Sequence, residues 1–113
     1  MARTTFSGPV ASQNGFIGVT GATLTSVLKA SATIDFTSLS ANTTADSSGI
    51  TVTGAAVGDP VIVGVPATIA AGLVVTGYVS AADTVKVRAA NVTASPIDPA
   101  SGTYTVTVIK ATA

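Results

Sequence analysis

The sequence contains no histidine, cysteine, tryptophan or glutamate. General acid–base catalysis and nucleophilic catalysis depend on histidine, cysteine and glutamate more than on other side chains. Most metal sites also draw on histidine or cysteine ligands. These absences argue against an enzyme and against a bound cofactor or metal, and they favour a structural or binding module.

Charge is also scarce, because only 9% of the residues are charged and the formal net charge is zero. The five basic residues are scattered, and only two of them stand close together: Arg3, Lys29, Lys86, Arg88 and Lys110. A nucleic-acid interface needs several phosphate contacts from lysine and arginine, so we expect no nucleic-acid partner. A net charge near zero lowers the solubility of a free monomer, which favours a protein that is part of a larger assembly.

The long apolar runs typical of a membrane span are missing as well. The mean hydropathy is +0.63, but the most apolar window, residues 57–75, is interrupted by Asp59, Pro60, Gly64 and Pro66. A spanning helix needs about 18 or more nearly uninterrupted apolar residues. We therefore expect two strands and a turn in this window, no membrane partner, and no signal peptide at the amino terminus.

Short alternating segments make up most of the chain, and alternation with a period of two is typical of half-buried strands. Residues 32–36, 49–53, 84–89 and 103–109 alternate, and residues 73–80 form a further expected strand. The inward side chains are Ile34, Phe36, Ile50, Val52, Val85, Val87, Tyr104, Val106 and Val108. Short strands separated by turn signals predict one all-β antiparallel β-sandwich over residues 23–113.

Four other segments carry more specific expectations. Residues 61–65 are continuously apolar, which predicts a strand buried on both faces. Residues 24–30 are a weak helical candidate, with strand or irregular structure left open, and residues 67–72 form a connection that could hold one helical turn. Residues 39–48 are predicted to be a polar loop. Gly77 interrupts a strand and indicates a bulge or a close backbone approach.

Polar residues outside these segments have ordinary structural interpretations. Asp46, Asp59, Asp83 and Asp98 are expected in turns, whereas Asp35 is expected to point outward from a strand. Tyr78 and Tyr104 could stack on a sugar, but core packing is the preferred interpretation. The two glycosylation sequons, at Asn42 and Asn91, are attributed to chance in a threonine-rich chain.

Residues 1–22 differ from the rest and are interpreted as an extended amino-terminal arm. They are rich in glycine, serine and threonine and show no sustained period, yet they hold Phe6, Val10, Phe16 and Ile17. A disordered tail is usually poor in aromatic residues and rich in charge. We therefore prefer an arm that becomes ordered against a partner over a plain flexible tail.

Several sequence runs resemble the β-sandwich domain of tailed-phage head decoration (cement) and head-fibre proteins. They are GAAVGDPV, AGLVVTGYVSAADTVKVR, NVTA and IDPASGTY, with TTFSGPV and NGF resembling the arm that precedes that domain. The resemblance implies a jelly-roll-like sandwich, often a homotrimer, that binds the major capsid protein between capsid subunits. The implied location is the outer capsid surface of a virion, after synthesis in the host cytoplasm.

The expected capsid contacts lie in the arm, and they are Arg3, Phe6, Pro9, Val10, Phe16 and Ile17. One alternative remains open, a fibre-tip or cell-surface β-sandwich module that binds carbohydrate or a host receptor. Such a module needs exposed aromatic side chains and convergent polar groups in a groove.

Overall fold

The computed structural model of the chain describes residues 5–17 and 22–112, which form eight strands and no helix in those two ranges. In chain order the strands are β1 (Phe16–Ile17), β2 (Thr23–Ile34), β3 (Thr44–Asp46), β4 (Ile50–Thr51), β5 (Val61–Gly64), β6 (Leu73–Ala81), β7 (Thr84–Asn91) and β8 (Gly102–Thr112). The expected helical candidate at residues 24–30 is therefore part of a strand.

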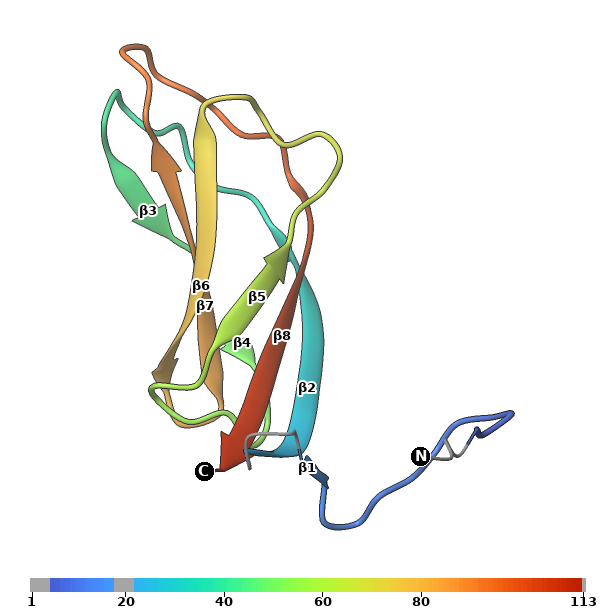
Figure 1. Cartoon of the computed structure of the whole chain (residues 1–113). Coiled ribbons are helices and arrows are strands. Elements are labelled where there is room, and N and C mark those ends of the chain that lie inside the picture. The colour runs from blue at the N-terminus through green and yellow to red at the C-terminus, as the bar shows by residue number, and fades with distance from the viewer. Residues whose placement is uncertain (1–4, 18–21, 113) are drawn as a thin grey trace.

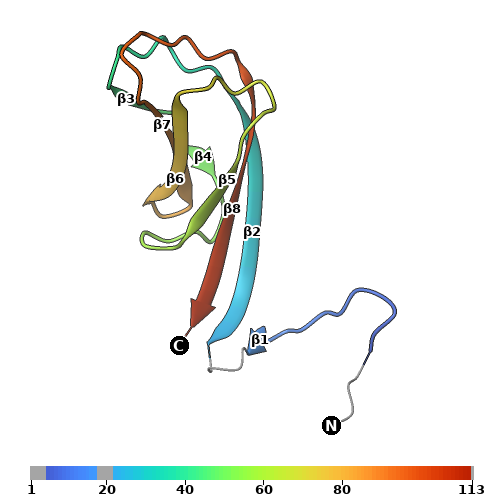
Figure 2. The same cartoon turned by 45° about the horizontal axis from the view of Figure 1, so that its top comes forward.

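The strands form two facing antiparallel sheets. One sheet has the order β1-β2-β8-β5, and in the other β7 pairs with β6 on one edge and with β3 and β4 on the opposite edge. Figure 1 shows β2, β5 and β8 on one side of the body and β3, β6 and β7 on the other, and Figure 2 shows the two layers from above. The predicted all-β antiparallel sandwich is confirmed, whereas the finer jelly-roll description stays a prediction.

The two central strands supply the middle of the core. Val85 and Val87 in β7 and Val106 and Val108 in β8 have no exposed surface. Aromatic packing adds to this core, because the rings of Phe36 and Tyr104 meet edge to face with their centroids 5.8 Å apart. The alternation predicted for residues 84–89 and 103–109 is therefore confirmed, with small branched side chains filling most of the space between the sheets.

The expectation of a strand buried on both faces at residues 61–65 is wrong. β5 is an edge strand that pairs only with β8 among the described residues, and its outward side chains reach solvent. Ile62 is 57% exposed and Val65 is 44% exposed, while Val61 and Val63 pack against the core. A run of apolar residues does not by itself distinguish a central strand from an edge strand whose outer face is also apolar.

The expected polar loop at residues 39–48 is also only partly correct. It contains β3, and Leu39 is buried and bridges to Ile97 through reciprocal backbone hydrogen bonds of 2.7 and 2.9 Å. Residues 67–72 contain a turn in which Ile69 N–H donates to the Pro66 carbonyl, and no helical turn forms there. In residues 39–48, the turn-forming residues therefore gave no indication of the strand β3 or of the core contact made by Leu39.

Gly77 allows the two sheets to approach each other closely where β5 crosses β6. A Cβ atom at this position would lie 2.6 Å from Cγ2 of Val63 and 2.8 Å from Cγ1 of Val61. The strand irregularity in this hairpin lies elsewhere, between Val79 and Ala81. Of the two interpretations of Gly77, the close approach is the correct one.

We predict that Gly77→Ala destabilises the sandwich by about 1–3 kcal/mol, because the added methyl group overpacks the contact with β5. Equilibrium unfolding in denaturant measures this difference. Gly64→Ala is the matched control, since a Cβ there would meet its nearest atom at an ordinary 3.7 Å. An equal effect of both substitutions would contradict the close-approach explanation.

Candidate interaction surfaces

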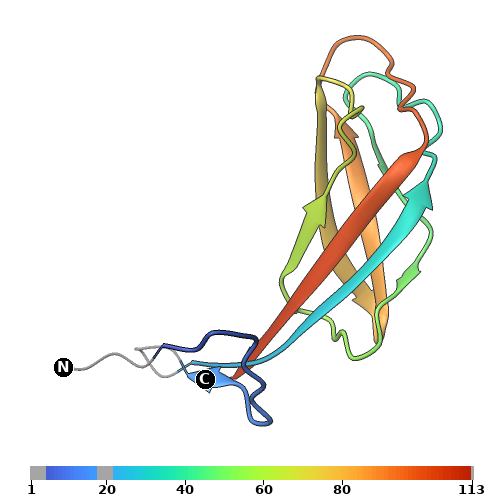
Figure 3. The same ribbon diagram turned by 90° about the vertical axis from the view of Figure 1, so that its right-hand side faces the viewer.

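The amino-terminal arm leaves the body at the far end of the long β2 and β8 strands (Figure 3). Residues 5–14 are exposed, including Pro9, and the large apolar side chains of Phe6 and Val10 are 66% and 46% exposed. Two bulky apolar groups are thus held in solvent on an extended segment. Of the other predicted capsid contacts, Arg3 lies outside the described residues, and Phe16 and Ile17 form the backbone of β1.

A short pairing attaches the arm to the sandwich. In β1, Phe16 lies opposite Leu24 and Ile17 lies opposite Thr23, so β1 adds to the edge of β2. Gly15 precedes this pairing with a φ of +84°, and a Cβ atom there would collide with the carbonyl oxygen of Leu24. Ser12 donates its hydroxyl hydrogen to the Gly15 carbonyl at 2.7 Å. Glycine is therefore required where the arm turns away from β2.

The outer face of the first sheet is uncharged except for Lys29. We name it the threonine face, and its members are Thr33 of β2, Thr103, Thr105 and Thr107 of β8, with Val27, Ile62 and Lys29. Val27 is 58% exposed and lies opposite Ile109 in the strand register. Such a face costs less to cover with another protein than a charged face would, because burying an unpaired charge costs far more than burying a threonine hydroxyl, which can find a hydrogen-bond partner in the interface.

The outer face of the second sheet carries a compact polar cluster instead. Asp46 of β3 accepts from Nε of Arg88 at 2.7 Å and from its second guanidinium nitrogen at 3.1 Å. Tyr78 of β6 donates its hydroxyl hydrogen to the same carboxylate at 2.6 Å. The guanidinium of Arg88 also lies over the Tyr78 ring, 4.7 Å from its centroid. The cluster ties three adjacent strands together across their solvent face.

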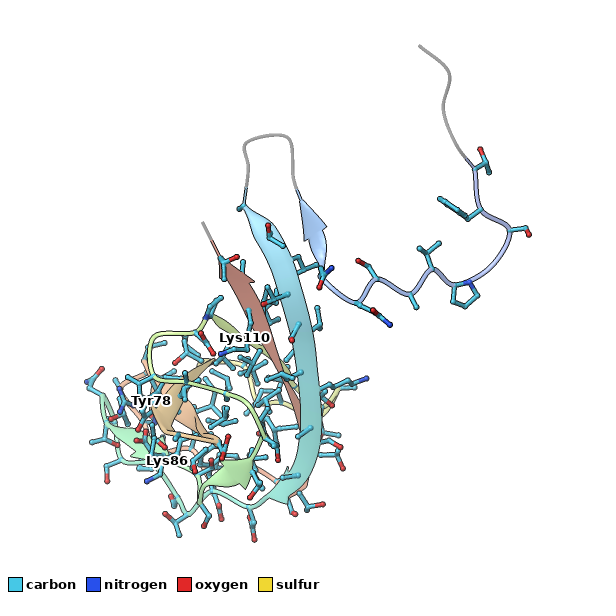
Figure 4. The ribbon with its side chains drawn as sticks, turned by 90° about the horizontal axis from the view of Figure 1, so that it is seen from below. Tyr78, Lys86 and Lys110 are labelled. Carbon is cyan, nitrogen blue, oxygen red and sulfur yellow. The ribbon has the colours of Figure 1, made fainter. Side chains whose placement is uncertain are left out.

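Two expectations are wrong at this cluster. Asp46 is a strand residue in β3 rather than a turn residue, and Tyr78 points outward from β6 rather than into the core. Figure 4 shows Tyr78 and Lys86 together on the side of the body away from β2, in keeping with their positions opposite each other in the strand register. Tyr104 is buried as expected.

The cluster lowers the pKa of the Asp46 carboxyl to about 2 from an ordinary 3.8, chiefly through the Arg88 hydrogen bonds and secondarily through the Tyr78 hydroxyl. The same contact with Asp46 raises the pKa of Tyr78 and that of Arg88. Because the folded-state pKa of Asp46 lies below the unfolded value, the ionised carboxylate stabilises the fold above about pH 4. That contribution is lost as the pH falls through about 2.

Asp59 and Asp83 each accept hydrogen bonds in a loop. Asp59 accepts from its own turn, from Ala56 N–H at 2.9 Å, and forms a 2.6 Å ion pair with Lys110, which lowers the Asp59 pKa. Asp83 occupies the β6–β7 hairpin with a φ of +61° and accepts from Gly54 N–H at 2.7 Å. The turn interpretation is correct for both. Asp59 also contacts Lys110 of β8, and Asp83 also contacts Gly54 between β4 and β5.

A buried asparagine organises the opposite end of the sandwich. Asn91 is 1% exposed, and its side-chain nitrogen donates to the carbonyls of Leu39, Ser40 and Ser95 at 3.1, 3.3 and 2.8 Å. Its side-chain oxygen accepts from the backbone N–H and the hydroxyl of Thr93. The sequence spacing Asn-x-Thr matched a sequon, but in this fold the asparagine joins two loops.

The described residues hold no group of three or more metal-binding side chains, and no helix among them is long and apolar enough to cross a membrane. Comparison with known proteins gave no matching family model, no matching curated protein and no matching solved structure. The fold class is accordingly established by the strands themselves, as an all-β antiparallel sandwich that carries an amino-terminal arm.

We predict that Arg88→Ala raises the pKa of Asp46 toward its ordinary value, and that Tyr78→Phe raises it by less, because the Arg88 bonds are the larger cause. A carboxyl-carbon NMR titration measures both. Thr76→Val is the control, since Thr76 lies opposite Arg88 without a side-chain bond to Asp46. An unchanged titration in Arg88→Ala would show that the ion pair does not form.

We also predict that Asn91→Ala costs about 3 kcal/mol of unfolding free energy, because it removes the buried side-chain hydrogen bonds that join the two loops and leaves the Thr93 N–H without its acceptor. Thermal or denaturant unfolding measures the loss. Asn14→Ala, in the exposed arm, is the matched control and should leave stability unchanged. A loss below about 1 kcal/mol would mean that water replaces the asparagine at that end of the sandwich.

Proposed function

We propose that this chain is a structural virion protein that decorates the outer surface of a phage icosahedral capsid. In this role it binds between capsid subunits and reinforces their joints as a cement protein. Its partners are the major capsid protein and further copies of itself, and a homotrimer is the expected oligomer. The sequence resemblance to tailed-phage head decoration proteins supports the proposal.

The arm is the single observation that carries the proposal. Phe6 and Val10 stand exposed on a segment that has no charged side chain between residues 5 and 15 and that projects from the sandwich. Burying one such side chain contributes about 1.5–3 kcal/mol. An arm of this kind is suited to reaching a neighbouring subunit of a shell.

Repetition and surface chemistry support the same role. A contact that is weak in one copy gains through effective concentration when several linked copies bind together. When another subunit covers the threonine face, Lys29 is the one charged side chain among its members that must be desolvated. Both features suit a protein that acts in many identical copies.

The carbohydrate-binding alternative receives less support from the aromatic side chains. Phe36 and Tyr104 are in the core, and one face of the Tyr78 ring is covered by the Arg88 guanidinium. Sugar binding by stacking needs an open aromatic face within a groove of polar groups. Among the described aromatic side chains, only Phe6 is largely open to solvent, and it lies on the arm.

Quantitative mass spectrometry of particles produced by the strain that encodes this chain tests the proposal. We expect a simple stoichiometric ratio of this chain to the major capsid protein. With Phe6→Ser and Val10→Ser combined, capsid binding should weaken about a hundredfold or more, since roughly 3 kcal/mol or more of apolar burial is lost. The copy number per particle should fall accordingly.

Val57→Ser is the matched control, because Val57 is an exposed apolar residue of the sandwich rather than of the arm. Particles with this variant should keep the full copy number. A handful of copies of the unmodified chain per particle would instead favour the receptor-binding alternative, and its absence from particles would overturn the virion proposal.

A further inference from the structure

One long edge of the first sheet is free. β8 covers one edge of β2, and β1 covers the other edge only at Thr23 and Leu24. From residue 26 to residue 34, no strand among the described residues pairs with that second edge. A free edge presents unpaired backbone N–H and C=O groups and is a template for adding a strand.

A groove with both polar and apolar lining lies beside the far half of this edge. It is lined by residues 32–37 and 45–50, has a volume of about 270 Å³, and includes the buried side chains of Ile34, Phe36 and Ile50. Its volume leaves room for a phenyl ring supplied by an added strand.

The arm has the pattern that such a strand needs. Phe6 and Val10 are four positions apart, so in an extended conformation both point to the same face. Residues 5–11 carry no charge, and their seven residues extend over about 23 Å. The edge from residue 26 to 34 has nine residues and is long enough to accept them.

The alternation of β2 shows how the faces would match. β2 has a bulge between Leu24 and Ser26, so the register of β1 does not extend past it. Beyond the bulge, an added antiparallel strand that places Val10 opposite Ala30 also places Phe6 opposite Ile34. Ala30 and Ile34 are inward members of β2. Both apolar arm residues would then point inward, and Phe6 would enter the groove.

The arm does not continue along the β2 strand of its own chain. A turn at residues 13–14, closed by the Ser12 hydroxyl on the Gly15 carbonyl, directs residues 5–11 away from the edge. Figure 4 shows the arm leading away from the body, so that residues 5–11 do not lie along the edge of β2. The same contacts can be made by the arm of another molecule, as in domain swapping.

We propose that residues 5–11 of one copy add as an antiparallel strand to the free edge of β2 in a second copy, with Phe6 in the groove beside Ile34. This inference goes beyond the proposed function, because it assigns the arm a second copy of this chain as its partner and applies to the protein in solution. On a particle, the copies would then be linked to one another by their arms.

Disulfide trapping tests the exchange in solution, without any capsid. In the proposed register Ser7 lies opposite Thr33, on the outer side of the sheet, and paired positions bring Cβ atoms within about 4.5–5.5 Å. The chain has no cysteine, so Ser7→Cys and Thr33→Cys add the only thiols. Differently tagged copies of the two single variants are mixed and oxidised, and the mixed disulfide is identified by mass spectrometry.

Ser7→Cys mixed with Thr76→Cys is the matched control, because Thr76 is also an exposed strand threonine but lies on the other sheet. We expect the Thr33 mixture to form the mixed disulfide at least tenfold faster than the control. Light scattering should also show the unmodified chain as an oligomer, and the chain with Phe6→Ser and Val10→Ser as a monomer.

Equal rates in the two mixtures would overturn the inference. So would a monomeric, intramolecular disulfide in a chain that carries Ser7→Cys and Thr33→Cys together, because the arm would then occupy its own groove. Neither outcome touches the capsid proposal, which is tested by copy number in particles. Conversely, trapped exchange in solution would stand even if the chain were absent from particles.

Discussion

β2 and β8 pair along almost their whole length, from Thr23 opposite Thr112 to Ile34 opposite Gly102. This pairing joins the first long strand to the last, so the sheet and the core depend on contacts that are distant in sequence. It places the inward side chains of β8 opposite β7 and carries both strands beyond the body as a two-stranded extension. The arm, the free edge of β2 and the threonine face all owe their positions to it.

The core between the sheets is built from small side chains. Valine and alanine supply most of the core side chains of β7 and β8, and Phe36 and Tyr104 are the aromatic pair of the interior. Small side chains bring the sheets close together, which is why Gly77 has no room for a methyl group beneath Val61 and Val63. Polar side chains hold the loops at the two ends of the sandwich by hydrogen bonds, Asn91 at one end and Asp59 and Asp83 at the other.

Alternation along the chain was enough to predict which residues of β7 and β8 face inward, because a strand with one buried face has only two ways to orient its side chains. It was not enough for residues 61–65, where the neighbours of a strand decide its exposure. The positions of Asp46, Tyr78 and Arg88 depend on three strands that are adjacent in space and separated in sequence. No local pattern contains that information, although an aspartate and an arginine on outward strand positions could have suggested a pair.

The pairing of Thr23 with Thr112 brings the start of β2 and the end of β8 to the same end of the molecule, next to β1 and the arm. A protein fused genetically after residue 112 would therefore emerge beside the arm and crowd whatever the arm binds. The loops around Asn91 lie at the other end of the sandwich, but they are fixed by its hydrogen bonds and tolerate little insertion.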